Sequence, residues 1–309
     1  MNARQRGVAI VLAMGVVALA AIAATAIAVS QSTWARRNEL STEHVQAQAM
    51  VGAGVDWARA VLSDDLRATG AVDHLGEPWA LRLPPIPIDN GELLGHIEDA
   101  QGKFNLNNLV SGGKVDIKQL ENFQRLLAIL GLPPELADAL ADWIDADSEP
   151  QPQDGAEDGY YLALDPPYLA ANRPLIDVEE LALVRGFDAG VRARLRPFVT
   201  ALPGSTQVNV NTAPPEVLAA IIKNMDIDMA RALVLERERA YFRDPAEFYS
   251  RLPPAVSSSV SVGDAMVKSD YFIATLRVKI GDAQARGTAL LARPPMGFGW
   301  PVIVWRKIS

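Results

Sequence analysis

The stretch RQRGVAIVLAMG, Arg4 to Gly15, joins a short basic leader to a run of 22 residues without a charge, Val8 to Val29. As a helix this run rises about 33 Å at about 1.5 Å per residue, close to the hydrocarbon thickness of a bilayer. The next charged residue is Arg36. The sequence therefore predicts an N-terminal helix that can span a membrane.

Three interpretations fit this segment. A cleaved secretory signal would use the small residues AIA at 26–28, although its apolar region is usually only about 7 to 15 residues long. An uncleaved signal anchor fits the hydropathy equally well. The third interpretation rests on the junction, because a short leader ending in Gly7 before an apolar helix resembles the processing site of type IV pilin-like proteins. In that family a prepilin peptidase cuts after the glycine on the cytoplasmic side, here before Val8, and the new amino terminus is methylated.

One position departs from the common pilin pattern. The fifth residue after the expected cut is Leu12, where pilins normally have glutamate. In a filament that carboxylate neutralises the terminal ammonium of the subunit ahead, since either charge alone is costly in an apolar core. A subunit with no subunit ahead of it needs no such carboxylate. Leu12 therefore indicates either a filament tip or an unusual pilin.

Composition narrows the function further. The formal charge of −8 and the pI near 5.0 argue against a surface for nucleic acid or anionic lipid. Without cysteine, the chain can form neither a disulfide nor a cysteine-based zinc site. Catalytic motifs are missing, and the three histidines, His44, His74 and His96, are isolated. We expect a protein that is not an enzyme.

Hydrophobic patterning predicts an α+β fold. Beyond the membrane, Leu40, Val51, Val55, Ala58 and Leu62 fall largely on helical spacing, so the first helix should continue to about Leu62. Alternating segments predict strands at both ends of the remaining chain: WALRL and LLGHIED with a turn at 89–91, then DYFIATLRVKIG, ARGTALLAR and GWPVIVWRKIS with Asp282 in a turn. Between about 110 and 263 the pattern is helical, and SGG at 111–113 and SSSVSVG at 257–263 are the expected linkers. A helical domain is thus inserted into a small sheet.

The segment DWIDADSEPQPQDGAEDGYY, residues 142–161, concentrates acids. It contains seven carboxylates and no base: Asp142, Asp145, Asp147, Glu149, Asp154, Glu157 and Asp158. Such a loop must be strongly solvated or must bind a cation, and hard oxygen ligands favour calcium or magnesium. It is not an EF-hand, because Pro150 replaces the turn glycine and Ala156 the closing glutamate. From spacing alone, a metal site and a solvated acidic loop both remain open.

A second segment, VNVNTAPPEVLAAII at 208–222, resembles the entry to a helix-hairpin-helix module, which suggests a membrane-anchored DNA-binding protein of the uptake type as the alternative function. Two features oppose it: NMDID lacks the hairpin glycines, and residues 216–244 carry six acids against five bases. We expect Asn209 and Asn211 to satisfy backbone groups instead.

Taken together, the motifs resemble one family, the minor pseudopilin K proteins of type II secretion, also called general secretion pathway protein K. The resemblance spans nearly the whole chain. It rests on the leader without glutamate at the fifth mature position, GKFNLNNL at 102–109, DWIDADSEP at 142–150, GAEDGYY at 155–161, ANRPLIDVEELALVRGF at 171–187 and VNVNTAPPEVL at 208–218.

The resemblance implies a pseudopilin fold, in which a long N-terminal transmembrane helix packs on a small antiparallel sheet, with a large all-helical domain inserted between strands. The implied segments are a leader at 1–7, a transmembrane helix at 8–29, stem helix and first strands at 30–109, the insert at 110–263 and closing strands at 264–309. It also implies a loop with two structural calcium ions. Carried over by motif, the ligands lie among Asp145, Asp147, Glu149, Glu157 and Asp158, with Asp142 and Asp154 as weaker candidates.

The same resemblance implies a role and partners. A subunit with a bulky head would cap the pseudopilus tip with minor pseudopilins I and J, followed by minor pseudopilin H and major pseudopilin G. It would be processed by prepilin peptidase, sit once through the bacterial inner membrane with its N terminus cytoplasmic, and work with the inner-membrane assembly platform. The exposed position of a tip also suggests contact with exoproteins, whereas no nucleic acid is expected.

Overall fold

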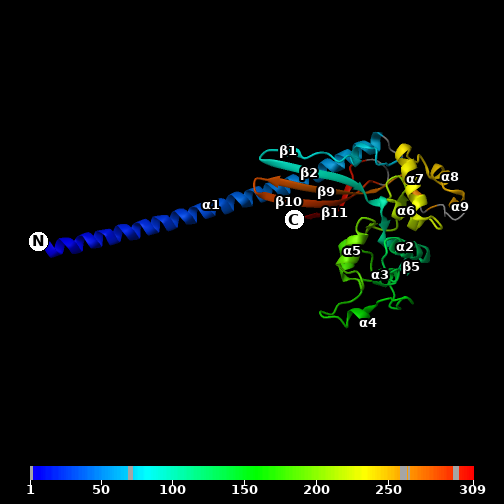
Figure 1. Ribbon diagram of the computed structural model, residues 1–309, viewed down its shortest axis with the longest axis horizontal. Helices are drawn as coiled ribbons and strands as arrows, with labels where there is room; N and C mark the ends of the chain where they lie inside the picture. The colour runs from blue at the N-terminus through cyan, green and yellow to red at the C-terminus, as the bar shows by residue number, and fades with distance from the viewer. Residues whose placement is uncertain (1–2, 69–71, 258–262, 264, 295–298) are drawn as a thin grey trace.

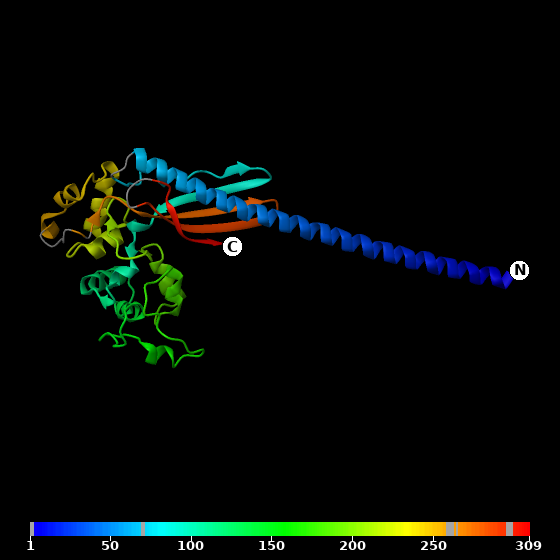
Figure 2. The same ribbon diagram turned by 180° about the vertical axis from the view of Figure 1, so that it is seen from behind.

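The computed structural model describes residues 3–68, 72–257, 263, 265–294 and 299–309. A long N-terminal helix runs onto a sheet, and a block of helices lies at the end of the sheet away from the N-terminus (Figure 1). The view from behind shows the same arrangement (Figure 2). This is the predicted α+β plan, a helix packed on an antiparallel sheet with helices inserted between strands.

Helix α1 extends from Ala3 to Ala68 without a break, six residues beyond the predicted end. Its apolar first half protrudes from the protein, and α1 is the one helix among the described residues that is long and apolar enough to cross a membrane. Its second half buries Val51, Val55 and Ala58 at helical spacing, as predicted. The sheet therefore packs on the C-terminal half of α1.

The sheet has five antiparallel strands in the order β1-β2-β9-β10-β11. Their bounds are Ile86–Ile88, Gly91–Asp99, Tyr271–Ile280, Ala283–Ala292 and Val302–Ile308. Along β9 every second residue is buried against α1, from Phe272 to Ile280. Gly287 of β10 lies so close to Val51 that an added Cβ would collide with it. Small residues on the sheet therefore let the helix approach.

One predicted strand is wrong. Residues 79–83 do not join the sheet, because Pro78–Ala80 forms the 3-10 turn η1 and the two prolines that follow at 84 and 85 have no N–H to donate to a ladder. The alternation that suggested a strand has another cause. Trp79 is buried in the helix–sheet core, edge-on to Phe272 at 5.2 Å between ring centroids.

Two short parallel strand pairs lie at the base of the insert. The chain leaves the sheet after Asp99, whose register partner is Phe272 at the start of β9. Strand β3 (Phe104–Asn105) pairs in parallel with β6 (Val199–Thr200), and β7 (Val208–Asn209) pairs in parallel with β8 (Ala265–Met266). These two pairs close a first lobe, residues 104–200, and a second lobe, residues 208–266.

Both lobes share one hydrophobic core, in which α2 of the first lobe packs on α6 of the second. The first lobe contains η2 (Ala100–Gly102) at its entry, then η3 (Leu106–Leu109), β4 (Val110–Ser111), β5 (Lys114–Val115), α2 (Ile117–Ile129), α3 (Leu136–Ile144), α4 (Asp158–Tyr161), η4 (Val178–Leu183) and α5 (Ala189–Leu195). The second contains α6 (Pro215–Ile221), α7 (Ile227–Arg239), α8 (Pro245–Ser250) and α9 (Pro254–Ser257). The insert is therefore one helical body.

The insert begins earlier than the predicted boundary at 110, which falls on β4. SGG at 111–113 is not a linker. It forms the turn of the β4–β5 hairpin, with Gly112 and Gly113 both at positive φ (60° and 78°), as a two-residue hairpin turn requires. Of the second expected linker, 257–263, residues 258–262 lie outside the described part of the chain.

Candidate metal centre

Helix α3 brings the acidic loop together. All of its residues are buried, and its last turn carries Asp142 while Asp145 caps its C-terminal end. The loop then returns so that Glu157 directly precedes α4. The loop between α3 and α4, at the far end of the first lobe in Figure 1, therefore starts at Asp145 and ends at Glu157, twelve residues later.

Three of the five predicted ligands converge. Asp145, Asp147 and Glu157 each offer one carboxylate oxygen within 4.8 Å of the others. Asp145 is fully buried and Glu157 is 7% exposed, yet neither oxygen of either side chain has a hydrogen-bond partner among the described residues. Buried carboxylates are almost always paired, so this arrangement needs a cation or protons. A set of hard oxygen donors fits calcium or magnesium.

The electrostatics of the cluster point the same way. Burial, followed by repulsion from the neighbouring carboxylates of the loop, raises the pKa of Glu157 to about 7. Burial and the charge of Asp147 raise the pKa of Asp145 to about 6. The side chains that act most strongly on the two carboxyls are all acidic. Without a cation, both carboxyls therefore keep their protons to a higher pH than exposed carboxyls do.

The other acids of the loop have different surroundings. Both oxygens of Asp142, which is fully buried, accept the Gln151 N–H at 3.1 Å, and burial raises its pKa to about 6. Asp158 accepts the Ala170 N–H at 3.0 Å. Asp154 pairs with Arg185 at 2.5 Å, and Glu149 is exposed. These four shape or border the loop outside the convergent cluster.

Two residues that sequence reasoning missed hold the loop in place. Arg185 pairs with Asp154, donates to the Gly155 carbonyl at 3.2 Å and lies over the Tyr160 ring at 4.9 Å. Gly155 leaves no room for a Cβ, because Asp142 and the Gln151 backbone occupy that space. Both stand in quoted motifs, Gly155 in GAEDGYY and Arg185 in ANRPLIDVEELALVRGF, but they lie 30 residues apart, so spacing alone gave no signal that they meet.

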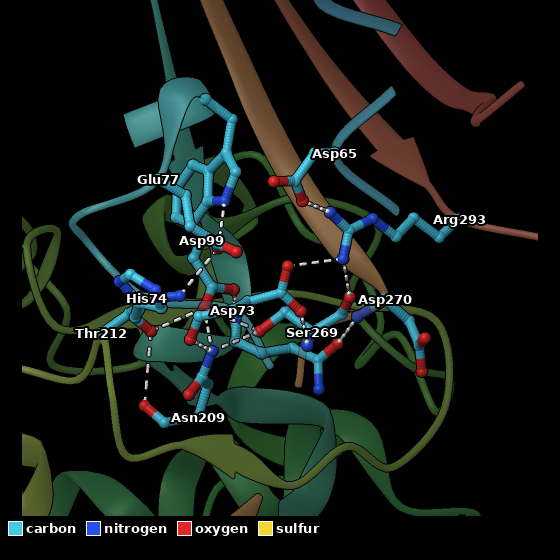
Figure 3. Close-up of polar contacts among 12 residues, drawn as sticks. Asp65, Asp73, His74, Glu77, Asp99, Asn209, Thr212, Ser269, Asp270 and Arg293 are labelled. Atoms are coloured by element: carbon cyan, nitrogen blue, oxygen red, sulfur yellow. Dashed lines mark hydrogen bonds and ion pairs between the residues drawn. The ribbon is translucent and has the colours of Figure 1, made fainter. Parts of the chain in front are cut away.

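A second group of acids lies at the joint between the sheet and the insert (Figure 3). Asp65, Asp73 and Glu77 are all buried with oxygens within 4.8 Å of one another. Here, however, Arg293 bridges the group, at 2.6 Å from Asp65 and 2.5 Å from Asp73. This arginine supplies the positive charge that the loop cluster lacks, so the loop is the better metal candidate.

The joint also contains Asp99, at the last position of β2. Its carboxylate accepts hydrogen bonds from Ser269, Thr212 and Asn209 at 2.7, 2.6 and 2.9 Å (Figure 3). Asn211 meanwhile exchanges two hydrogen bonds with the backbone of Phe242. The asparagines of VNVN thus satisfy buried polar groups, as predicted.

Comparison with known proteins divides the insert into the same two lobes. Two family models, both described as type II secretion system protein K, match residues 102–204 and 208–263, so the break between them falls between the first and the second lobe. The chain belongs to the type II secretion system protein K family. Protein K of Pseudomonas aeruginosa is 42% identical over 293 residues, covering 91% of this chain and 87% of that protein. Protein K of Klebsiella pneumoniae is 34% identical over 315 residues, covering 97% and 96%.

A solved structure matches the whole architecture. It is the crystal structure of the GspK-GspI-GspJ complex from the type 2 secretion system of enterotoxigenic Escherichia coli, in which the matching chain has 26% sequence identity and a TM-score of 0.75. The match covers 88% of this chain and 99% of that one. The chain is thus a minor pseudopilin with the protein K fold, and its apolar N-terminal helix is suited to anchor it in a membrane.

Proposed function

We propose that this protein K caps the tip of the type II secretion pseudopilus, initiates its assembly and supports the export of folded proteins from the periplasm. The main support for this proposal is the position of the insert, which lies at the end of the molecule opposite the N-terminus (Figures 1 and 2). Copies stacked head to tail along α1 would clash at this block, whereas α1 stays free to pack on subunits below. Leu12 is consistent with a tip position, because the fifth mature residue then offers no carboxylate to neutralise the terminal ammonium of a subunit above.

The partners follow from this position. The solved relative is in a complex with GspI and GspJ, which supports minor pseudopilins I and J as direct neighbours. Minor pseudopilin H and major pseudopilin G would follow below, on the inner-membrane assembly platform. We propose prepilin peptidase cleavage between Gly7 and Val8, methylation of Val8, a cytoplasmic N terminus and a periplasmic head. The role is mechanical, not enzymatic, and the exposed head is the surface available to exoproteins.

We also propose that the loop binds calcium. Asp145, Asp147 and Glu157 would hold one ion, and the adjoining Glu149 and Asp158 would contribute to a second. Bound calcium supplies positive charge that a chain without disulfides can use to stabilise the folded loop over the open one. The support is the pair of buried carboxylates without partners.

One assembly experiment tests the tip role. The full chain in neutral detergent is mixed with pseudopilins I and J, and light scattering measures the mass of the complex with and without chelator. A complex with one copy of each subunit is expected. Immunogold labelling of native pseudopili should then mark one end, and regular labelling along the shaft would contradict the proposal.

A further inference from the structure

A pocket of about 340 Å³ lies where the segment after α1 meets the second lobe. His74, from the sheet side, stacks on Tyr241 of the second lobe with ring centroids 3.9 Å apart and planes 10° from parallel. Arg237 and Arg239 from the end of α7 line the same pocket. Its one acidic lining residue is Glu238, which is exposed. The pocket is therefore basic in a chain whose formal charge is −8.

Arg237 is the unusual member of this group. Its side chain is buried, with 7% of the residue exposed, and its Nη1 donates to the carbonyls of Val210 and Ala213 at 2.7 and 2.6 Å. Among the described residues Arg237 forms no ion pair within 4 Å, and the hydrogen bonds that its side chain makes are these two from Nη1. A buried guanidinium without a carboxylate is costly, and burial accordingly lowers the pKa of Arg237 to about 10. The charge of the exposed Glu238 opposes this effect of burial only in part.

The remaining donors of Arg237 match one class of ligand. A guanidinium presents parallel N–H groups that fit two oxygens of a carboxylate or phosphate, and a second arginine at the pocket rim adds attraction. We propose that this pocket is an oxyanion site, in which Arg237 binds a carboxylate or phosphate group with help from Arg239. The bound anion would sit between the 74–76 segment and α7, and would fasten the second lobe to the sheet.

Equilibrium dialysis of the full chain in neutral detergent, at constant ionic strength and without divalent cations, tests this site. The probes are radiolabelled inorganic phosphate and N-acetylglutamate amide, which stands for an acidic side chain of a protein. We expect one saturable site per chain for at least one probe. Tighter phosphate binding would identify a free or lipid phosphate as the source, and tighter glutamate binding a carboxylate presented by a protein.

Three variants locate the site. Arg237→Gln should abolish binding, and Arg239→Gln, at an exposed position, should weaken it by about tenfold or more, as expected for one charge-assisted hydrogen bond. Arg231→Gln is the matched control, because this exposed arginine of α7 pairs with Asp228 outside the pocket and should leave binding unchanged. Since Arg237 also braces the 210–213 turn, Arg239→Gln keeps the test valid if Arg237→Gln misfolds. Failure of both probes to bind the unaltered chain, or equal binding by Arg239→Gln and Arg231→Gln, would overturn the proposal.

Discussion

The surroundings of Asp145 and Glu157 distinguish a candidate metal site from a buried ion pair. Each is buried with both carboxylate oxygens unpartnered among the described residues, which would destabilise the fold if both were ionised without a cation. Asp65 and Asp73 are equally buried but share Arg293. Buried carboxylates therefore occur in two settings in the described part of this fold, one with an arginine between them and one without a base.

Replacing Glu157 with Gln should separate calcium binding from folding. The substitution removes a ligand charge and a buried carboxylate, so the calcium-free variant should be as stable as the parent or more so, while the rise in Tm on adding calcium should largely disappear. Thermal unfolding with calcium and with chelator measures both. Glu121→Gln, at an exposed position of α2, is the control and should retain the calcium response. A full response in Glu157→Gln would remove this residue from the site.

The stability of the calcium-free protein should depend on pH. Because the folded-state pKa values of Asp145 and Glu157 are raised to about 6 and 7, the folded protein binds protons that the unfolded chain releases at about pH 4. Their contribution is thus present below about pH 4 and is lost as pH rises through 6 to 7. Asp65 and Asp99, raised to about 6, act in the same direction. Melting curves from pH 4.5 to 8 should show Tm falling, with a smaller fall in Glu157→Gln.

At the level of elements, the packing of α1 on the sheet depends on residues with little or no side chain. Gly287→Ala should push Val51 away from β10 and destabilise the helix–sheet core by about 1–3 kcal/mol, as overpacking does. Urea unfolding of the full chain measures this loss. Gly112→Ala would serve poorly as a control because of its positive φ, so Gly159→Ala is preferable: its φ is not positive and no atom lies within 4 Å of an added Cβ.

The joint between sheet and insert depends on one arginine. Arg293→Met would leave Asp65 and Asp73 buried without their base, which should cost about 3–5 kcal/mol in the free energy of unfolding. Adding Asp73→Asn should recover part of the loss by removing one uncompensated charge. Denaturant unfolding of the single and double variants gives the comparison. A double variant no more stable than the single one would mean that the ion pair is not the source of the effect.

The sequence predicted elements well where one periodicity dominates. Alternation in 271–280 and helical spacing in 51–62 reflect burial against a single neighbour, so the strand β9 and the helix α1 were found. Prediction failed where the same pattern had another cause, as at Trp79, or where glycines served a hairpin, as at 112–113. Within the acidic loop, spacing alone could not rank the seven carboxylates, and the family resemblance named five ligands of which three converge. Their convergence depends on the fold of residues 146–157 and on Arg185 far along the chain.

At the scale of the whole molecule, the insert leaves and rejoins the sheet at neighbouring positions of β2 and β9. Asp99 and Phe272 are register partners, so replacing residues 100–270 with a short Gly/Ser turn should leave a β2–β9 hairpin beneath α1. Asp99→Asn should accompany the excision, because the partners of Asp99 at 209, 212 and 269 are removed. If the insert alone blocks stacking, the shortened chain should occur more than once per pseudopilus. Quantitative labelling that still finds one copy would assign the limit to α1.

The unbroken course of α1 has a mechanical consequence. It contains no proline, the usual cause of a sharp kink, and from Val8, the proposed mature start, to Ala68 it corresponds to a rod of about 92 Å at about 1.5 Å per residue. A stiff rod passes an axial displacement from one end to the other with little loss. A force applied to the apolar end of α1 would therefore be passed along the helix to the sheet that packs on it, and through the sheet to the helical insert.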